Sequence, residues 1–129
     1  MAVDKSALEE GADFAPRFDA NGLIVCVTVE AGTREILMVA YMNQLALDKT
    51  IETGVAHYWS RSRNALWRKG DTSGQVQKIV SLSVDCDQDA IQLMVEAGGD
   101  GKACHTGRKS CFYRKLETRD GARRLVFTA

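Results

Sequence analysis

Short apolar runs rich in β-branched residues dominate this chain and predict that it is built mainly of strands. One run covers residues 23–30, and a second, at 35–41, follows a short glycine-containing turn. Two such runs joined by a tight turn are typical of a β-hairpin. We expect further strands at 55–60, 76–84, 90–96, 112–116 and 125–128.

Helical spacing is limited to two segments. A short helix is expected at 5–10, and a longer one at 44–53, where an asparagine precedes the segment and a glycine follows it, as helix caps do. Leu47 and Ile51 lie four positions apart, so they are expected to share the buried face of the longer helix. The pattern therefore predicts a strand-rich α+β fold with few helices, in a single domain over residues 1–129.

The middle of the chain is less regular. In the strand expected at 76–84, most apolar side chains share one face, and only Ile79 is apolar on the other. Segment 61–74 begins with arginines and ends in small polar residues, so we expect a loop that offers hydrogen-bond donors. The glycine-rich segment 98–101 is expected to be a flexible connection.

The composition is that of a soluble globular protein. Of 129 residues, 45% are apolar and 26% are charged, and the formal net charge is zero. Zero net charge argues against a nucleic-acid binder with a broad basic face, since phosphate neutralisation dominates such binding. The longest apolar run, at 36–42, is too short to span a membrane, and no signal peptide is visible at 1–10. We therefore expect a cytoplasmic location, where clustered cysteines more often bind metal than form disulfides.

Two segments, 85–89 and 104–111, concentrate the side chains that can bind a metal or move a proton. The chain has no CxxC pair, but the thiols of Cys86, Cys104 and Cys111 match a catalytic zinc site whose fourth position holds water. A structural zinc site and three unconnected buried cysteines are the alternatives. The fourth cysteine lies in the first apolar run and is expected to be a buried, inert thiol.

The three aspartates, Asp85, Asp87 and Asp89, suggest a second metal. Like charges this close repel one another unless they are solvated or neutralised, and a hard cation such as magnesium prefers oxygen ligands. An acidic surface turn is the alternative, whereas a calcium loop would need glycine where Ala90 stands. In an extended strand the aspartates would share one face and Cys86 would point to the other. One segment could then serve two metals, if it bends or if its faces meet different subunits.

With these residues assembled, the chain resembles the phosphoribosyl-AMP cyclohydrolase family from about residue 24 to residue 116. Six motifs in order carry the resemblance, and their combined length makes it specific. They are MVAYMN at 38–43, HYWSRSR at 57–63, LWRKG at 66–70, TSG at 72–74, DCDQDA at 85–90 and ACHTGRKSCF at 103–112.

The resemblance implies an enzyme of histidine biosynthesis. This family hydrolyses the N1–C6 bond in the adenine ring of 1-(5-phosphoribosyl)-AMP, the third step of that pathway, to give a formimino-aminoimidazole-carboxamide ribonucleotide. The family fold is a mixed, strand-rich pseudo-barrel in an intertwined homodimer whose subunits share the zinc ligands. No nucleic-acid or membrane partner is expected, and the chain is expected to carry the cyclohydrolase activity alone. The implied ligands are Cys86, Cys104 and Cys111 for zinc, and Asp85, Asp87 and Asp89 for magnesium.

His105 is the candidate general base or proton shuttle, because histidine titrates near neutral pH. Zinc would lower the pKa of a bound water, and the resulting hydroxide would attack C6 of the ring. The alternative is that His105 only orients a metal ligand. His57 lies beside aromatic residues, where a packed or substrate-orienting role is at least as plausible as catalysis.

The substrate carries two phosphates, and donors for them are available in several places. Arginine suits bidentate contact, and small polar residues with free backbone N–H groups suit an anion. Trp67 could stack on the base or be a half-buried structural side chain, and each basic residue could be a solvated surface group. The candidate substrate-binding residues are Arg61, Arg63, Trp67, Lys69, Thr72, Ser73 and Arg108.

Two other function classes fit a zinc-binding chain of this size. A zinc nucleoside deaminase needs H-x-E and P-C-x-x-C signatures, and neither is present. A structural zinc module or binding module would depend on its cysteines for folding and would not need His105.

Overall fold

The structure, a computed structural model, describes residues 4–70, 74 and 76–128. None of the helices in these residues is long and apolar enough to cross a membrane. The elements are α1 (Lys5–Glu10), β1 (Ile24–Glu30), β2 (Ile36–Met42), α2 (Gln44–Thr53), β3 (His57–Ser60), β4 (Ala65–Arg68), β5 (Gln77–Val84), β6 (Ala90–Ala97), β7 (Arg114–Arg119) and β8 (Ala122–Phe127).

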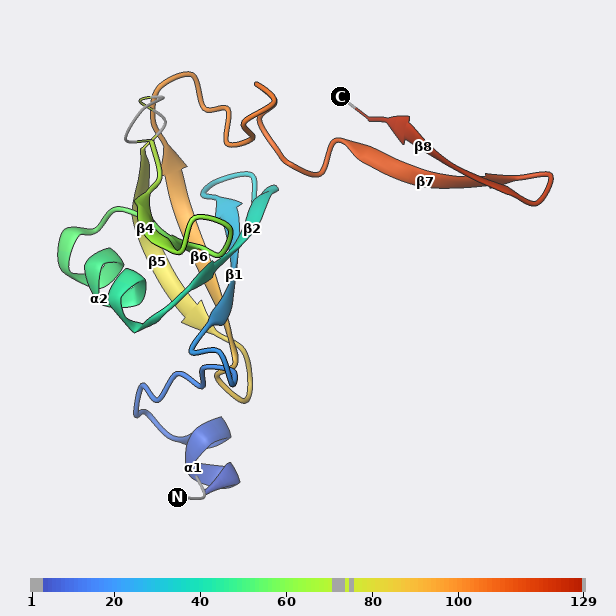
Figure 1. Cartoon of the computed structure of the whole chain (residues 1–129). Coiled ribbons are helices and arrows are strands. Elements are labelled where there is room, and N and C mark those ends of the chain that lie inside the picture. Colours follow the sequence, from blue (N-terminus) through green and yellow to red (C-terminus); the bar gives the residue numbers. More distant parts are fainter. Residues whose placement is uncertain (1–3, 71–73, 75, 129) are drawn as a thin grey trace.

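A four-stranded mixed sheet with strand order β2-β1-β6-β5 forms the centre of the molecule (Figure 1). β1 pairs antiparallel with β2 and parallel with β6, and β6 pairs antiparallel with β5. The hairpin predicted for the first two strands is confirmed, and so is the strand-rich α+β class. The sheet is open in the single chain, and β3-β4 and β7-β8 form two separate two-stranded sheets.

The core lies on the face of the four-stranded sheet against which α2 and the β3-β4 hairpin pack. Ile24 and Cys26 of β1 and Leu93 of β6 point into this face, where they meet Leu47 of α2 and Tyr58 of β3. They share the face because successive side chains of a strand point to opposite sides. Cys26 is the expected buried thiol, and burial raises its pKa to about 12.

A buried polar network connects β3 to the sheet. The Tyr58 hydroxyl donates to Oε1 of Gln77 at 2.6 Å and accepts from Oγ1 of Thr28 at 2.7 Å. Gln77 in turn donates through Nε2 to Sδ of Met38 at 3.4 Å. Tyr58, Thr28 and Gln77 are all buried, so each hydrogen bond satisfies a group that water does not reach.

The predicted bounds of α2 are confirmed, and its two caps explain them. Oδ1 of Asn43 accepts from the N–H of Ala46 at 2.9 Å, which satisfies a donor in the first turn. Gly54 ends the helix with φ 73°, a left-handed conformation that glycine adopts without steric cost. Local capping chemistry therefore sets both ends of this helix.

The expected buried face of α2 is only half correct. Leu47 is buried, but Ile51 is 56% exposed, so the prediction for Ile51 is wrong. Thr50 lies inside instead, where its Oγ1 donates to the carbonyl of Ala46 at 2.8 Å and accepts from the N–H of His57 at 2.9 Å. The helix faces the backbone of β3 here, and a buried backbone N–H needs a polar partner that isoleucine cannot supply.

Part of the loop predicted at 61–74 is a strand. Ala65–Arg68 forms β4, which pairs antiparallel with β3 so that Tyr58 lies opposite Trp67 and Trp59 lies opposite Leu66. Four residues are too few to show a clear alternation of polar and apolar side chains. The strand is stabilised by its partner β3, which sequence periodicity does not reveal.

A β-bulge in β5 reverses the expected alternation of its side chains. The register with β6 shifts between Ile79 and Ser81, so Val80 is the additional residue. Ile79 and Leu82 consequently share the half-buried face that packs against the core, while Val80 is 52% exposed. The prediction that Val80 and Leu82 share a face and Ile79 opposes them is therefore wrong.

The last two strands form a hairpin that extends away from the rest of the molecule (Figure 1). They were expected at 112–116 and 125–128, but they run on to meet at a tight turn of Asp120 and Gly121, which have φ 51° and 78°. The hairpin exposes the apolar side chains of Leu116, Leu125 and Phe127.

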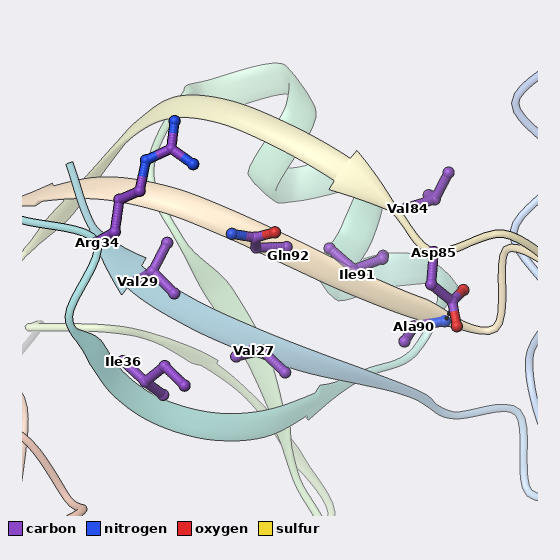
Figure 2. Close-up of a pocket in the computed structure, with 9 residues that line it drawn as sticks. All are labelled: Val27, Val29, Arg34, Ile36, Val84, Asp85, Ala90, Ile91 and Gln92. Atoms are coloured by element: carbon purple, nitrogen blue, oxygen red, sulfur yellow. Dashed lines mark hydrogen bonds between the residues drawn. The ribbon is translucent and has the colours of Figure 1, made fainter. Parts of the chain in front are cut away.

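The sheet face opposite the core is also apolar and uncovered in the single chain. It contains a hollow of about 450 Å³ whose wall includes Val27, Val29 and Ile36 (Figure 2). Arg34 and Asp85 lie at opposite ends of this hollow. Exposed apolar patches rimmed by polar residues are typical of protein–protein contact surfaces.

The Tyr58 network makes a prediction about stability. Tyr58→Phe is expected to lower the free energy of unfolding by about 1–3 kcal/mol, because Gln77 and Thr28 would be left buried with an unsatisfied polar group. Urea unfolding followed by circular dichroism measures the change. Tyr113→Phe is the control, since the Tyr113 hydroxyl makes no hydrogen bond within the described part of the chain. Equal stability of the two variants would contradict the prediction.

Candidate functional site

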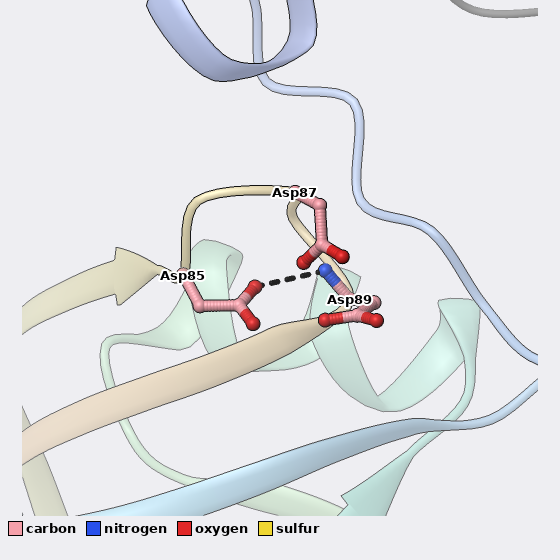
Figure 3. A group of neighbouring side chains, drawn as sticks. All are labelled: Asp85, Asp87 and Asp89. Atoms are coloured by element: carbon pink, nitrogen blue, oxygen red, sulfur yellow. Dashed lines mark hydrogen bonds between the residues drawn. The ribbon is translucent and has the colours of Figure 1, made fainter. Parts of the chain in front are cut away.

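Three carboxylates lie close together in the turn at 85–89 between β5 and β6, called the acidic turn below (Figure 3). One oxygen each of Asp85, Asp87 and Asp89 lies within 4.8 Å of the others. Oδ1 of Asp85 accepts from the N–H groups of Asp89 at 3.0 Å and Ala90 at 3.1 Å, which closes the turn. Gln88 has φ 59°, so the chain reverses here and is not extended. The predicted grouping of the aspartates is found, but a turn produces it and strand alternation does not.

The carboxylates strongly influence one another's protonation. Hydrogen bonds with Asp87 and Asp85 raise the pKa of Asp89 to about 6, and the hydrogen bond with Asp89 lowers the pKa of Asp87. Without a cation, Asp89 is therefore expected to hold its proton to a higher pH than carboxyl groups usually do. Three convergent oxygen donors with excess negative charge fit the preferences of a hard divalent cation such as magnesium.

Gln88 holds the acidic turn against the N-terminal segment. Its Oε1 accepts from the N–H of Ala15 at 2.8 Å, and its Nε2 donates to the carbonyls of Leu8 and Asp13, both at 3.1 Å. The backbone N–H of Arg17 also donates to the Gln88 carbonyl at 2.7 Å. Because the Gln88 side chain is buried and fully paired, the neighbouring aspartates are left on the outer side of the turn.

The second group of candidate ligands lies in the loop at 104–111, called the thiol loop below, which is hydrogen-bonded to β2. The N–H of Cys111 donates to the carbonyl of Leu37 at 2.7 Å, and Oγ of Ser110 donates to the carbonyl of Ile36 at 2.7 Å. Within the loop, the N–H of Cys104 donates to the carbonyl of Arg108 at 3.0 Å. These bonds bring the Cys104 and Cys111 side chains close enough for each thiol to influence the pKa of the other.

The two thiols have different ionisation properties. Burial opposes ionisation of Cys104, but hydrogen bonds from Thr106 and Cys111 and the charge of Lys69 outweigh it and lower the pKa of Cys104. Oγ1 of Thr106 lies 3.1 Å from Sγ of Cys104. Burial, together with the neighbouring Cys104, raises the pKa of Cys111 to about 11. A pair of soft sulfur donors, one of them with a lowered pKa, fits zinc.

Cys86 lies far from this thiol pair within one chain. It is exposed in the turn before β6, whereas Cys104 and Cys111 follow the end of β6, at the other end of the sheet (Figure 1). A strand of eight residues is about 23 Å long. Among the described residues, the three aspartates are the only group of three or more potential ligands close enough to share an ion. One chain therefore brings together two of the three predicted zinc ligands.

The two histidines differ in their surroundings. His105 is exposed, directly beside Cys104 in the thiol loop, so it can approach a ligand bound there. His57 is buried in β3, and its Nδ1 lies 2.8 Å from the carbonyl oxygen of Val55. This arrangement fits a packed histidine in the core.

Several of the predicted substrate-binding residues line one hollow of about 490 Å³, called the aromatic hollow below. Arg61, Arg63 and Trp67 line it together with Tyr41 and Trp59. The Arg61 guanidinium lies 4.1 Å from the centre of the Tyr41 ring. An aromatic wall with two guanidinium groups suits a nucleotide, since bases stack on rings and phosphates pair with arginine.

Tyr41 also connects this hollow to the acidic turn. A neighbouring hollow of about 320 Å³ is lined by Tyr41, Asp89 and Arg17, among others. Tyr41 lies within the motif at 38–43, yet nothing in the sequence pattern singled it out. A signal that could have found it is the alternation of side chains along β2. This alternation puts the Tyr41 ring on the sheet face opposite the core, where it lines both hollows.

The other predicted substrate contacts are found elsewhere. The Arg108 guanidinium lies 4.1 Å from the centre of the Tyr113 ring, at the base of the β7-β8 hairpin. Lys69 is buried, and its Nζ donates to the carbonyl of Ala103 at 2.5 Å. Thr72 and Ser73 lie outside the described residues. The structure thus separates the candidates into those that line the aromatic hollow and those that lie near the thiol loop.

Comparison with known proteins identifies the family. A family model described as Phosphoribosyl-AMP cyclohydrolase matches residues 38–113, more than half of the chain. The chain belongs to the phosphoribosyl-AMP cyclohydrolase family. Its members are hydrolases, so the chain is an enzyme of that class.

Individual phosphoribosyl-AMP cyclohydrolases match over almost the whole chain. The protein of that name from Chelativorans sp. is 62% identical over 120 residues, which cover 93% of this chain and 86% of the relative. The Bradyrhizobium diazoefficiens protein is 58% identical over 127 residues, 98% of this chain and 89% of the relative. The Brucella anthropi protein is 60% identical over 118 residues, 92% and 84% respectively.

Proposed function

We propose that this chain opens the adenine ring of 1-(5-phosphoribosyl)-AMP by hydrolysis at the N1–C6 bond, giving the formimino-aminoimidazole-carboxamide ribonucleotide in the third step of histidine biosynthesis. The observation that carries the proposal is the family match at 38–113, a region that contains both the acidic turn and the thiol loop. The reaction would take place in the cytoplasm, with a phosphorylated nucleotide as the only substrate besides water.

Cys86, Cys104 and Cys111 would hold a zinc ion. The proposal is supported by the adjacent thiols of Cys104 and Cys111 and by the lowered pKa of Cys104, which favours the thiolate that zinc requires. Bound there, the metal would supply a water of lowered pKa as the nucleophile for C6. Asp85, Asp87 and Asp89 would hold magnesium, which would neutralise their mutual repulsion and help to balance the charge of the substrate phosphates.

His105 would act as the general base. Its exposed position beside Cys104 lets the imidazole reach a water or substrate atom at the thiol loop, and histidine is the side chain most often used for proton transfer in enzymes. The ring could take the proton of the attacking water and return it to N1 as the N1–C6 bond breaks. His57 is assigned no part in this chemistry because its ring is buried and bonded to backbone.

The aromatic hollow would bind the nucleotide. Arg61 and Arg63 offer two cations for phosphate, and Tyr41, Trp59 and Trp67 offer rings for the base. The adjoining hollow at Asp89 would place one phosphate near the magnesium ligands. Thr72 and Ser73 remain candidates for a second phosphate contact, and Arg108 could close over the ligand from the thiol loop.

The active form would be an intertwined homodimer in which the subunits share each zinc site. The separation of Cys86 from the thiol pair supports this, since a second copy can supply the missing thiol. The uncovered apolar sheet face and the extended β7-β8 hairpin support it further, because both offer apolar surface for association.

The proposed activity is tested by metal analysis and an assay of ring opening on the same purified protein. We expect about one zinc per chain, ring opening of 1-(5-phosphoribosyl)-AMP, and loss of both on chelation. Activity should return when zinc is restored, and removal of magnesium alone should also reduce turnover. Full activity in metal-free protein, or absence of ring opening in the metal-loaded protein, would contradict the proposal.

A second prediction concerns His105. His105→Ala is expected to fold and to bind zinc normally, but to lose about 10²- to 10⁴-fold in kcat, because the proton transfer would no longer be assisted. A second variant, His105→Gln, keeps a polar side chain of similar size but cannot accept the proton, so it should be equally impaired. A variant of His57 would not be a matched control because His57 is buried. Turnover at the wild-type rate in either variant would rule out the general-base role.

Subunit complementation tests the shared zinc site. Cys86→Ser and Cys104→Ser are each expected to be inactive alone. A mixture of the two with free subunit exchange should recover about a quarter of wild-type activity, because about half of the dimers are mixed and each mixed dimer has one intact site of two. The matched control is a mixture of Cys104→Ser with Cys111→Ser, which should stay inactive because both thiols come from the same loop. No recovery in the first mixture would argue for ligands from a single chain.

A further inference from the structure

Lys69 is a buried cation that has no acidic partner among the residues that the structure describes. Of the lysines and arginines in the described residues, only Lys69 is buried, with 8% of its surface exposed. No carboxylate in the described part of the chain lies within ion-pairing distance of it. Burying an ammonium group is costly unless negative charge or hydrogen bonds compensate it. A compensating group must therefore lie elsewhere in its surroundings.

The surroundings of Lys69 are those of the thiol loop. Its Nζ donates at 2.5 Å to the carbonyl of Ala103, the residue directly before Cys104. The Trp67 ring lies on another side, with its centre 5.4 Å from Nζ. Burial lowers the pKa of Lys69, while the negative charges of Cys111 and Cys104 act in the opposite direction. Lys69 Nζ therefore lies at the thiol loop, whose thiolates can supply the negative charge that compensates the ammonium group.

Backbone contacts hold Lys69 in this position. Its N–H donates to the carbonyl of Ala56 at 3.1 Å, at the end of β4 where the β3-β4 hairpin meets the core. Ala56 and Ala103 are themselves buried. The backbone of Lys69 is therefore held by the β3-β4 hairpin, whereas the thiols lie in a loop that follows β6. The hydrogen bond from Nζ to the Ala103 carbonyl then connects this hairpin to the thiol loop.

We infer that Lys69 is a positioning residue of the thiolate metal site, where its charge compensates the sulfur ligands and its hydrogen bond holds the backbone that carries Cys104. The inference rests on the proposed zinc site. Three thiolates around a doubly charged zinc leave one net negative charge, which a buried ammonium group balances. The expectation that Lys69 contacts a substrate phosphate is the alternative, and the test separates the two.

The test measures zinc binding by the full-length protein in competition with a chromophoric chelator, without substrate. Lys69→Met is expected to weaken zinc binding about 10- to 100-fold, the usual cost of losing a group that orients or balances metal ligands. Lys69→Arg keeps the charge and a donor, so it should recover most of the affinity. Lys102→Met is the matched control, because Lys102 lies close to Cys104 in sequence but is exposed and pairs with Asp100. It should bind zinc as the wild type does.

A cobalt(II) substitution experiment adds a spectroscopic measurement. The thiolate-to-cobalt absorption of Lys69→Met should be shifted or reduced relative to wild type, while that of Lys102→Met should not change. If Lys69→Met does not fold, Lys69→Gln is compared with Lys69→Arg, since glutamine keeps a donor and lacks the charge. Weak zinc binding by the glutamine variant alone would support the inference, and wild-type binding by both would overturn it.

The outcomes also separate this inference from the proposed function. Lys69 variants that bind zinc normally but show a raised KM for the nucleotide would overturn the positioning role and favour the phosphate contact. Zinc-dependent ring opening by the wild type would still stand in that case. Wild-type protein that binds no zinc would overturn both the zinc site and the role of Lys69.

Discussion

The length of β6 is the constraint on which the arrangement of the site depends. β6 pairs in parallel with β1 and antiparallel with β5, and Leu93 and Val95 on it are buried in the core. A shift of one residue would turn these side chains to the uncovered face, so the register is strongly determined. The acidic turn precedes the first residue of this strand and the thiol loop follows its last. One chain therefore holds its oxygen donors and its paired sulfur donors at opposite ends of the sheet.

This separation has a chemical consequence as well as a geometric one. The aspartates lie in a solvent-accessible turn, where hydrogen bonds with Asp87 and Asp85 raise the pKa of Asp89. Of the two thiols, Cys104 is buried and Cys111 is exposed, and both influence a buried lysine that has no acidic partner among the described residues. A hard cation gains most at the first group and a soft one at the second. Distance prevents the two groups from competing for the same ion within a chain.

Local signals in the sequence predicted much of the fold. Asn43 and Gly54 mark the ends of α2 because capping depends on residues that are adjacent in sequence. The failures have non-local causes. β4 exists because β3 pairs with it, and the extra residue Val80 in β5 is defined only by its register with β6. The inward position of Thr50 likewise depends on the backbone of His57, which belongs to the next strand.

The geometry of the candidate site depends on contacts that the sequence does not show. Residue types and spacing identify which side chains can bind metals, but they do not show that Gln88 orients the aspartates or that Tyr41 lies between two hollows. Both roles arise from contacts with segments distant in sequence, and neither residue type has chemistry that draws attention by itself.

The basic residues show most clearly what three-dimensional structure adds. By composition, each could bind a phosphate, but their partners divide them. Lys109 pairs with Glu30 at 2.8 Å and Glu35 at 3.1 Å, so its charge is already balanced on the turn between β1 and β2. Its contact with Glu30 lowers the pKa of that carboxyl, which shows how closely the charges are matched.

Arg61 and Arg63 have a different environment. They line a hollow walled by aromatic rings, and Arg61 lies against the face of Tyr41 without a carboxylate partner in the described residues. A cation over a ring keeps most of its charge available for an anion, whereas one paired with carboxylates does not. The proposed phosphate recognition therefore fits the arginines of the hollow better than it fits Lys109, whose charge two carboxylates already balance.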